Sequence, residues 1–425
     1  MKRASAGDVE PAFIVASLYH TAKAYDIVTC MCSQPPWLAV GFESGAISLF
    51  NKGDDMALPA LLAGHAGGTL CAAFSSARAC LASGGGDGCV RTVACAAASD
   101  ASVECWQLNH ARSGATATAS GALIETVAAG AERWAAIVGR YIAVGLLRSE
   151  GAVASPLYLG PLGHVIDGVQ LLGDASVAAA SYGGVTLWAM RQHDGDVADS
   201  GVAEVDNQAP RPHPLDASAY QRVSLPAARR TADASLACDG WARSLLASPN
   251  GSWLAASVTV AGAYSSKLWL WRLRDGADFE CGGFDGPISA LSWSGDSSLL
   301  ASCSGPAALV WSFNEASSSS TLHGGPAGGK PRRFTASPSL RLVSAAFDRR
   351  RAWLACGADD GSVVAFCIVH ATPTLVLNPT CTMRDVGSLG PLEYLGWVGP
   401  CGHLAVAGCN SGVVATCRLD HGASA

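Results

Sequence analysis

One short pattern, repeated along the chain, constrains the fold more than any other feature. In residues 285–313, three apolar runs of strand type, Ile288–Trp293, Leu299–Cys303 and Ala308–Phe313, are separated by the turn sequences SGDSS and SGP. Strands so close together must pair as an antiparallel meander. Such a meander leaves one face unburied and one edge unpaired, so it is not stable alone in water. The chain therefore needs several copies that bury one another.

The same pattern occurs eight times. The copies lie at residues 26–50, 69–93, 134–158, 164–188, 241–273, 285–313, 341–369 and 392–419. Two pairs of neighbouring copies begin about 40–45 residues apart, the period of a blade with four strands, and the two longest intervals contain insertions. We therefore predict an all-β fold in which residues 1–425 form a single β-propeller of four-stranded blades. The repeat count predicts eight blades, and seven is the alternative because the copies at 134–158 and 164–188 begin unusually close together.

Three segments lie outside the repeats. Residues 12–18, AFIVASL, form a lone strand-like run that can close the ring as the outer strand of the last blade, which removes a free sheet edge. Insertions occupy residues 94–131, with one plausible outer strand at 104–108, and residues 191–233. The second insertion is rich in proline and poor in apolar residues, so we expect an exposed loop there. It is either a partner-binding arm or a tolerated insertion between blades.

The charge and hydropathy of the chain argue against several functions. The net charge is −6 and only 15% of residues are charged, whereas nucleic acid or anionic membrane would require a basic surface. No run of about 18 uncharged apolar residues predicts a transmembrane helix. Asp8, Glu10 and Pro11 stand where a signal peptide would begin its apolar core. We therefore expect a cytoplasmic protein that binds neither nucleic acid nor membrane.

The chain contains 16 cysteines, most of them at strand positions that hold small residues in other copies. We expect reduced, buried thiols. Cys30 and Cys32 lie two apart on a predicted strand and could converge on one face, but zinc sites use Cys-x-x-Cys. A second set, evenly spaced along strands and turns, consists of Cys401, His403, Cys409 and Cys417. We predict no metal and no cofactor.

Catalytic motifs are missing from the sequence as well. The segment GGPAGGKPRRF, residues 324–334, superficially resembles a phosphate-binding loop, but Pro331 stands where such a loop has Ser or Thr and lacks the necessary N–H. As an exposed loop, the segment carries a basic patch of Lys330, Arg332 and Arg333 that could steer an acidic partner. We predict no catalytic residues.

The repeats resemble the WD-repeat β-propeller family, in which Gly-His precedes two strands, a turn Asp follows, and a Trp stands six residues after the Asp. Gly64, His65 and Asp87 fit this motif, whereas Val93 takes the Trp position. The resemblance implies that the His, the Asp and a strand Ser or Thr share hydrogen bonds. Other Trp positions hold Trp188, Trp271, Trp311, Phe50, Phe366 and Cys417, and other Asp positions hold Asp360, Ser44, Tyr182, Ser265 and Ser411.

The resemblance covers nearly the whole chain and is nearest to a group of poorly characterised bacterial WD-repeat proteins. We expect a non-enzymatic scaffold whose rigid propeller presents loops to one or more protein partners. The candidate loops are residues 41–45, 84–88, 181–184, 358–361 and 409–412. The alternative is a propeller enzyme or metal-binding protein that uses the central channel. The apolar or small residues of the expected inner strands, SAAF, ALSW and LCAAF, count against this alternative.

Overall fold

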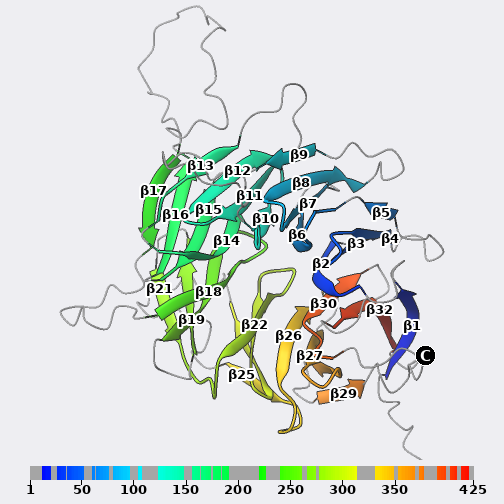
Figure 1. Ribbon diagram of the computed structural model, residues 1–425. Coiled ribbons are helices and arrows are strands. Elements are labelled where there is room, and N and C mark those ends of the chain that lie inside the picture. The colour runs from blue at the N-terminus through cyan, green and yellow to red at the C-terminus, as the bar shows by residue number, and fades with distance from the viewer. Residues whose placement is uncertain are drawn as a thin grey trace, which may run out of the picture.

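The structure is a computed structural model, and the parts of the chain that it describes form an all-β ring (Figure 1). The described residues are 12–20, 26–34, 36–51, 60–62, 64–75, 80–95, 104–107, 123–147, 156–162, 164–173, 176–182, 184–190, 220–225, 240–260, 266–273, 277–313, 331–348, 353–368, 373–377, 390–398, 403–408 and 413–420. Within these residues, no helix is long and apolar enough to cross a membrane.

The described strands pair into eight antiparallel sheets of four strands each. The first two sheets contain β2 (Val28–Gln34), β3 (Trp37–Phe42), β4 (Ile47–Asn51), β5 (Ala60–Leu62), and β6 (Thr69–Phe74), β7 (Cys80–Gly85), β8 (Cys89–Ala94), β9 (Glu104–Gln107). The next two contain β10 (Val127–Ala129), β11 (Arg133–Val138), β12 (Tyr141–Leu146), β13 (Leu157–Leu159), and β14 (Ile166–Leu172), β15 (Ser176–Ser181), β16 (Gly184–Met190), β17 (Tyr220–Leu225).

The remaining four sheets follow the same order along the chain. They contain β18 (Gly240–Ala247), β19 (Trp253–Val260), β20 (Ser266–Arg272), β21 (Ala277–Cys281), then β22 (Ile288–Trp293), β23 (Leu299–Ser304), β24 (Ala307–Ser312), β25 (Arg332–Thr335), and β26 (Leu342–Phe347), β27 (Trp353–Ala358), β28 (Val363–Cys367), β29 (Pro373–Leu377). The last sheet contains β30 (Tyr394–Val398), β31 (His403–Ala407), β32 (Val413–Asp420) and β1 (Ala12–His20).

The sheets are arranged around a central axis, with one innermost strand from each sheet. These innermost strands are β2, β6, β10, β14, β18, β22, β26 and β30, and each contacts the next. β30 in turn contacts β2, so the ring is closed (Figure 1). The chain is therefore a single β-propeller, and the segments SAAF, ALSW and LCAAF lie on innermost strands as expected.

The two ends of the chain meet in the last sheet. β1 runs antiparallel to β32, with Ala12 opposite Asp420 and His20 opposite Val413. The first strand of the sequence is thus the outermost strand of the last sheet, and it covers the edge that β32 would otherwise expose (Figure 1).

The two predicted insertions contribute outer strands. β9 lies at the position expected within residues 94–131. The prediction that residues 191–233 form only an exposed loop is wrong, because β17 pairs with β16, with Tyr220 opposite Met190 and Leu225 opposite Val185. The β17 sequence YQRVSL mixes polar and apolar residues and lies far from β16 along the chain, so it gave a weak signal. The other residues of this insertion lie outside the described part of the chain.

The hydrophobic core is divided among the interfaces between neighbouring sheets. Trp311, on the third strand of its sheet, packs in one cluster with Trp253 and Leu270 of the preceding sheet. Trp271 packs in the same way on Ala178 and Val185. In the sheet that begins with β10, the large aromatic side chain is on the second strand instead of the third. It is Trp134, which fills the space beside Gly145. Each interface is therefore filled by at least one large side chain.

Short polar contacts tie neighbouring innermost strands together. The Ser289 hydroxyl donates to the Leu342 carbonyl at 2.7 Å, and the Tyr394 hydroxyl donates to the Thr29 carbonyl at 2.6 Å. The other donors are Cys71 to the Ile124 carbonyl at 3.2 Å, Thr29 to the Thr69 carbonyl and Ser344 to the Leu392 carbonyl. Each contact pairs a backbone carbonyl that the ring would otherwise bury without a donor.

Glycines on the second strands allow this close approach between sheets. A Cβ added at Gly357 would lie 2.5 Å from the Leu392 carbonyl oxygen and 2.6 Å from Ser344 Oγ. Gly41 and Gly84 occupy matching places, beside Cys30 and Cys71 respectively. A side chain at any of these positions would push two neighbouring sheets apart.

We expect Gly357→Ala to destabilise the fold by about 1–3 kcal/mol, because the added methyl group overlaps backbone of the next sheet. Gly282→Ala is the matched control, because a Cβ there meets nothing within 4 Å, and it should change stability by less than about 0.5 kcal/mol. Urea unfolding followed by tryptophan fluorescence measures both values. Equal stability of the two variants would contradict the packing argument.

We also expect deletion of residues 1–20 to lower the melting temperature and cooperativity, and to cause self-association, because β32 becomes an open edge. Deletion of residues 1–11 alone retains β1 and should behave like the full chain. Calorimetry and light scattering distinguish the outcomes, and a monomeric, unchanged 1–20 deletion would show that ring closure does not depend on β1.

Candidate functional site

The motif residues Gly64, His65 and Asp87 meet at one edge of the sheet formed by β6–β9. His65 Nδ1 lies 2.8 Å from Asp87 Oδ1, and His65 Nε2 lies 2.9 Å from Ser83 Oγ. The His65 side chain is fully buried, whereas 14% of the Asp87 side chain is exposed. The imidazole thus links the turn between β7 and β8 to strand β7 itself.

Burial lowers the pKa of His65 from its ordinary value of 6.5, and outweighs the hydrogen bond and charge of Asp87, which act in the opposite direction. The neutral ring donates from Nδ1 to Asp87 and accepts the Ser83 proton at Nε2. Burial also acts to raise the pKa of Asp87, but hydrogen bonds from His65 and the Cys89 N–H, with the charges of His65 and Arg91, lower it overall.

Arg91 completes this cluster, although the sequence motif gives it no role. Its Nη2 lies 3.1 Å from Asp87 Oδ2, and its Nη1 donates to the Gly64 carbonyl. The only available sequence signal was its place four residues after the turn Asp. Because the contacts join the loop before β6 to the turn after β7, they brace this corner of the sheet.

Other sheets keep only part of this arrangement. Trp311 Nε1 donates to Ser302 Oγ at 3.2 Å, and Phe284 packs on the Trp311 ring at 6.5 Å between centroids. Phe284 stands four residues before Ile288, as His65 stands four residues before Thr69. An aromatic contact therefore takes the place of the histidine hydrogen bonds.

The remaining predicted WD-type residues are isolated from such a network. Trp271 is buried and its Nε1 has no hydrogen-bond partner among the described residues, because Ala256 stands where Ser302 stands in the next sheet. Trp188 is buried between two sheets. Asp360 Oδ1 accepts from the Ser362 backbone N–H at 2.9 Å and from the Ser362 hydroxyl, so it stabilises only its own turn.

The two described arginines of the predicted basic patch have different partners. Arg333 forms a salt bridge with Asp285, and Arg332 Nη1 donates to the Ile368 carbonyl at 3.0 Å. Lys330 lies outside the described residues. Asp285 therefore compensates the charge of Arg333, whereas Arg332 keeps its charge because its partner is neutral.

The cysteine pair at Cys30 and Cys32 lies in the core. Burial raises the pKa of Cys30 to about 12 and that of Cys32 well above its ordinary value, so both thiols stay protonated. Within the described chain, no group of three His, Cys, Asp or Glu residues could hold a metal ion. Cys401 and Cys409 lie outside the described residues, as do the side chains of His403 and Cys417.

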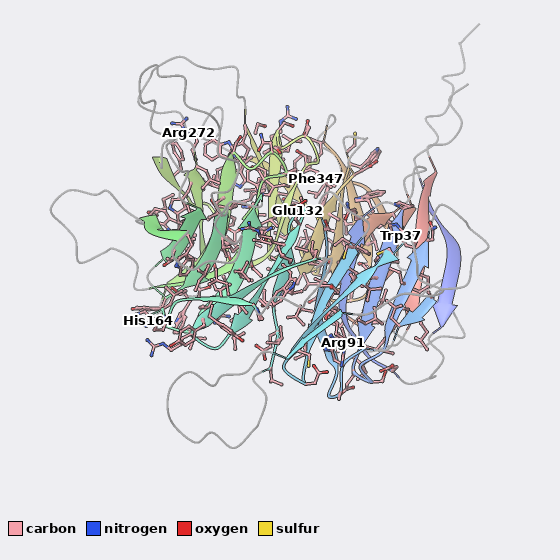
Figure 2. The ribbon with its side chains drawn as sticks, turned by 90° about the horizontal axis from the view of Figure 1, so that it is seen from above. Trp37, Arg91, Glu132, His164, Arg272 and Phe347 are labelled. Atoms are coloured by element: carbon pink, nitrogen blue, oxygen red, sulfur yellow. The ribbon has the colours of Figure 1, made fainter. Side chains whose placement is uncertain are left out.

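The face at which the innermost strands begin, here called the start face, carries the motif cluster. Each innermost strand begins there, and the turn between the second and third strands returns to it. Arg91 and His164 lie on this side of the ring in Figure 2, whereas Arg272 and Phe347 lie toward the opposite side. Four of the five predicted loops lie at least partly on this face; residues 409–412 are outside the described chain.

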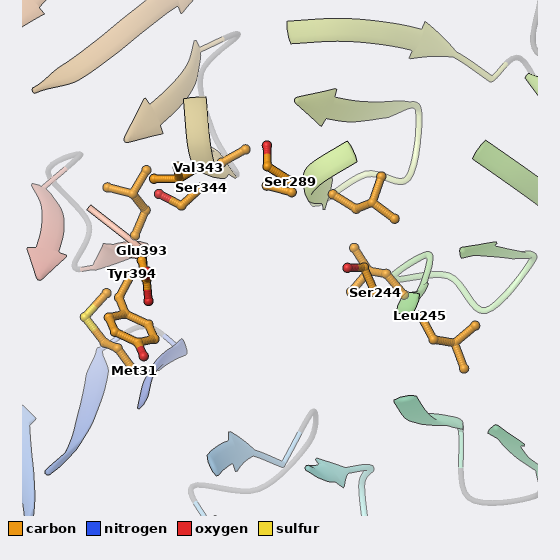
Figure 3. A pocket seen from close by; sticks show the side chains of 13 residues that line it. Met31, Ser244, Leu245, Ser289, Val343, Ser344, Glu393 and Tyr394 are labelled. Carbon is orange, nitrogen blue, oxygen red and sulfur yellow. The ribbon is translucent and has the colours of Figure 1, made fainter. Parts of the chain in front are cut away.

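A cavity of about 300 Å³ opens in the central channel near the start face. Side chains from β2, β18, β22 and β26 and the residues at the start of β30 line it, and Figure 3 shows Glu393 and Ser244 on opposite sides. Ser289 and Ser344 also line the cavity but donate their protons to backbone carbonyls. Sequence reasoning missed these residues. The one signal for Glu393 was its place directly after Leu392, an apolar residue that is buried just before β30.

Comparison with known proteins agrees with this geometry. A family model described as "WD domain, G-beta repeat" matches residues 58–92, which contain the His65 cluster, and residues 279–312, which contain Trp311. No curated protein matches the sequence. The chain thus contains WD repeats in a β-propeller, which confirms the predicted family resemblance in its broad form.

Two solved structures have a similar fold. The Sqt1 structure of Saccharomyces cerevisiae has a TM-score of 0.64 at 13% identity, with 95% of this chain and 98% of that chain covered. The β-propeller domain of Cps50 (Swd1) from Myceliophteria thermophila has a TM-score of 0.58 at 11% identity, with 96% and 99% covered. At these identities the likeness shows the fold alone, and neither structure supports the expected nearness to bacterial proteins.

We expect the fold to lose stability as the pH falls below about 6.5. Folding lowers the pKa of His65 from its ordinary value of 6.5, so the unfolded chain binds more protons than the folded chain as the pH falls through this value. The lowered pKa of Asp87 adds a further loss of stability only near its ordinary value of 3.8 and below. His65→Gln should be less stable than the wild type by about 1–2 kcal/mol at neutral pH, and its stability should change less between pH values of about 7.5 and 5.5.

Urea unfolding at a series of pH values measures both effects. Asp360→Asn is the control for the size of the loss, because the Asp360 carboxylate contacts only Ser362 in its own turn. The same pH dependence in His65→Gln and wild type would show that the His65 cluster does not sense pH.

Proposed function

We propose that the protein is a non-enzymatic protein–protein interaction scaffold that acts in the cytoplasm. The observation that carries this proposal is the closed ring, in which buried interfaces hold the sheets and short hydrogen bonds join several of them, while loops and strand starts remain exposed on the start face. A rigid support with variable exposed loops suits recognition of other proteins. The chain's net charge of −6 argues against nucleic acid and anionic membranes as partners.

We propose further that the eight four-stranded sheets are eight blades of this scaffold. The support is that each innermost strand contacts its two neighbours around the ring, and that the sheet containing β1 joins the first sheet through contacts of β30 with β2.

The central channel supports the competing enzyme proposal less well. Nucleophilic catalysis needs a nucleophile within reach of a base. The described lining of the cavity contains serines and one carboxylate, Glu393, but no His, Lys or Cys. Ser289 and Ser344 donate their hydroxyl protons to backbone carbonyls of the next sheet. These hydroxyl groups therefore hold neighbouring sheets together and are not paired with a base in the described part of the chain.

Affinity purification of the tagged protein from its native cytosol, with mass spectrometry and metal analysis of the same eluate, tests the scaffold proposal. We expect a protein partner in stoichiometric amount, with cross-links from that partner to the start face. A metal at about one ion per chain without any protein partner would overturn the proposal and favour the channel.

A further inference from the structure

Exposed apolar side chains gather on the start face. Four large hydrophobic residues are exposed among those that the structure describes, and three of them occupy the same position in their sheets. Ile27, Leu123 and Val165 each directly precede a buried residue at or shortly before the start of an innermost strand, and their exposed fractions are 39%, 54% and 57%. The fourth, Leu61, lies on an outermost strand. Val165 adjoins exposed and half-buried rings, and together these side chains offer an apolar surface to a partner.

An aromatic row extends this surface across two neighbouring sheets. The rings of His164 and Tyr182 lie 5.0 Å apart, and those of Tyr182 and Trp241 lie 5.2 Å apart, both edge to face. Tyr182 and Trp241 also form a backbone bridge that fixes the row. Because His164 is exposed beside Val165, and Tyr182 and Trp241 are half-buried, a large apolar side chain of a partner can pack here.

The charges of the start face select the partner. Six exposed carboxylates on this face form no salt bridge with any described residue: Glu43, Glu125, Asp167, Asp359, Asp360 and Glu393. Three exposed arginines without a salt bridge to a described residue, Arg140, Arg243 and Arg341, lie on the same face, and Arg243 acts on Asp167. The face therefore carries an excess of negative charge that is not compensated within the described chain, and a basic partner complements it.

Three of these carboxylates share one position in their sheets. Glu125, Asp167 and Glu393 each directly follow a buried residue at or shortly before the start of an innermost strand, namely Ile124, Ile166 and Leu392. Glu393 reaches the cavity of about 300 Å³, which is at the small end of ligand sites and suits one side chain better than a large cofactor.

We propose that the start face binds an extended basic segment of a partner protein, with an apolar side chain on Val165 and the aromatic row, and a Lys or Arg side chain at the channel mouth. This inference rests on the proposed scaffold function and adds the face and the chemistry of the partner. Electrostatic attraction orients the segment, and the apolar contact retains it.

Selection of displayed random peptides of about 12 residues against the full-length protein tests the proposal. We expect enrichment of peptides that combine Lys or Arg with Leu, Phe or Trp. Enrichment of acidic or neutral peptides, or no enrichment, would overturn it. A fluorescently labelled copy of a selected peptide is then used in fluorescence anisotropy. The affinity of the peptide for the protein should fall when the salt concentration rises from about 0.05 M to about 0.5 M.

Matched variants locate the binding site. Glu125→Gln with Glu393→Gln should weaken binding about tenfold, whereas Glu132→Gln with Asp296→Asn, on turns of the opposite face, should not change it. Val165→Ser should weaken binding by about threefold or more. Leu61→Ser alters a similarly exposed residue on the outermost strand β5 and should have no effect on binding. Thermal unfolding confirms that each variant is folded, and binding that is indifferent to both start-face variants would overturn the proposal.

The outcomes separate this proposal from the scaffold function. A stoichiometric cytosolic partner that cross-links elsewhere and binds Glu125→Gln with Glu393→Gln normally would leave the scaffold function intact and remove the start-face assignment. Failure to recover any protein partner would remove the scaffold function itself.

Discussion

The close approach of neighbouring sheets is the constraint on which the rest of the structure depends. Each sheet buries one face against the sheet before it and the other against the sheet after it, so no sheet has a core of its own. Large rings such as Trp311 fill the outer part of an interface, and glycines such as Gly357 let the inner parts meet. Because the innermost strands converge on the axis, the available space falls toward the channel, and side-chain size falls with it.

Packing of this kind explains why the hydrogen-bonded WD cluster can vary so widely between sheets. The cluster is complete where His65, Ser83 and Asp87 meet, and its place is taken by a Phe284–Trp311 contact in another sheet. Where the polar acceptor is missing, as at Ala256, the Trp271 ring still fills the interface. Apolar burial therefore holds every sheet, whereas the polar cluster reinforces one corner.

The repeats carried much of the fold in the sequence, because strand triplets separated by turn residues recur eight times. The outer strands were harder to predict, because they lie apart from the triplets and, like YQRVSL in β17, mix polar and apolar residues. The contacts of His65 and Asp87 followed from the motif, whereas Glu125, Asp167 and Glu393 became a group only once three strand starts, far apart in the sequence, lay on one face of the ring. A pattern within one repeat cannot reveal which residues of different repeats face each other.

The pairing of β1 with β32 also determines when the fold can form. β1 is synthesised long before its partner β32, since Ala12 lies opposite Asp420. Sheets in the middle of the chain can form as they are synthesised, but the ring cannot close before residues 413–420 emerge. Until that moment the sheets already formed are an open arc, and β1 waits without its partner strand.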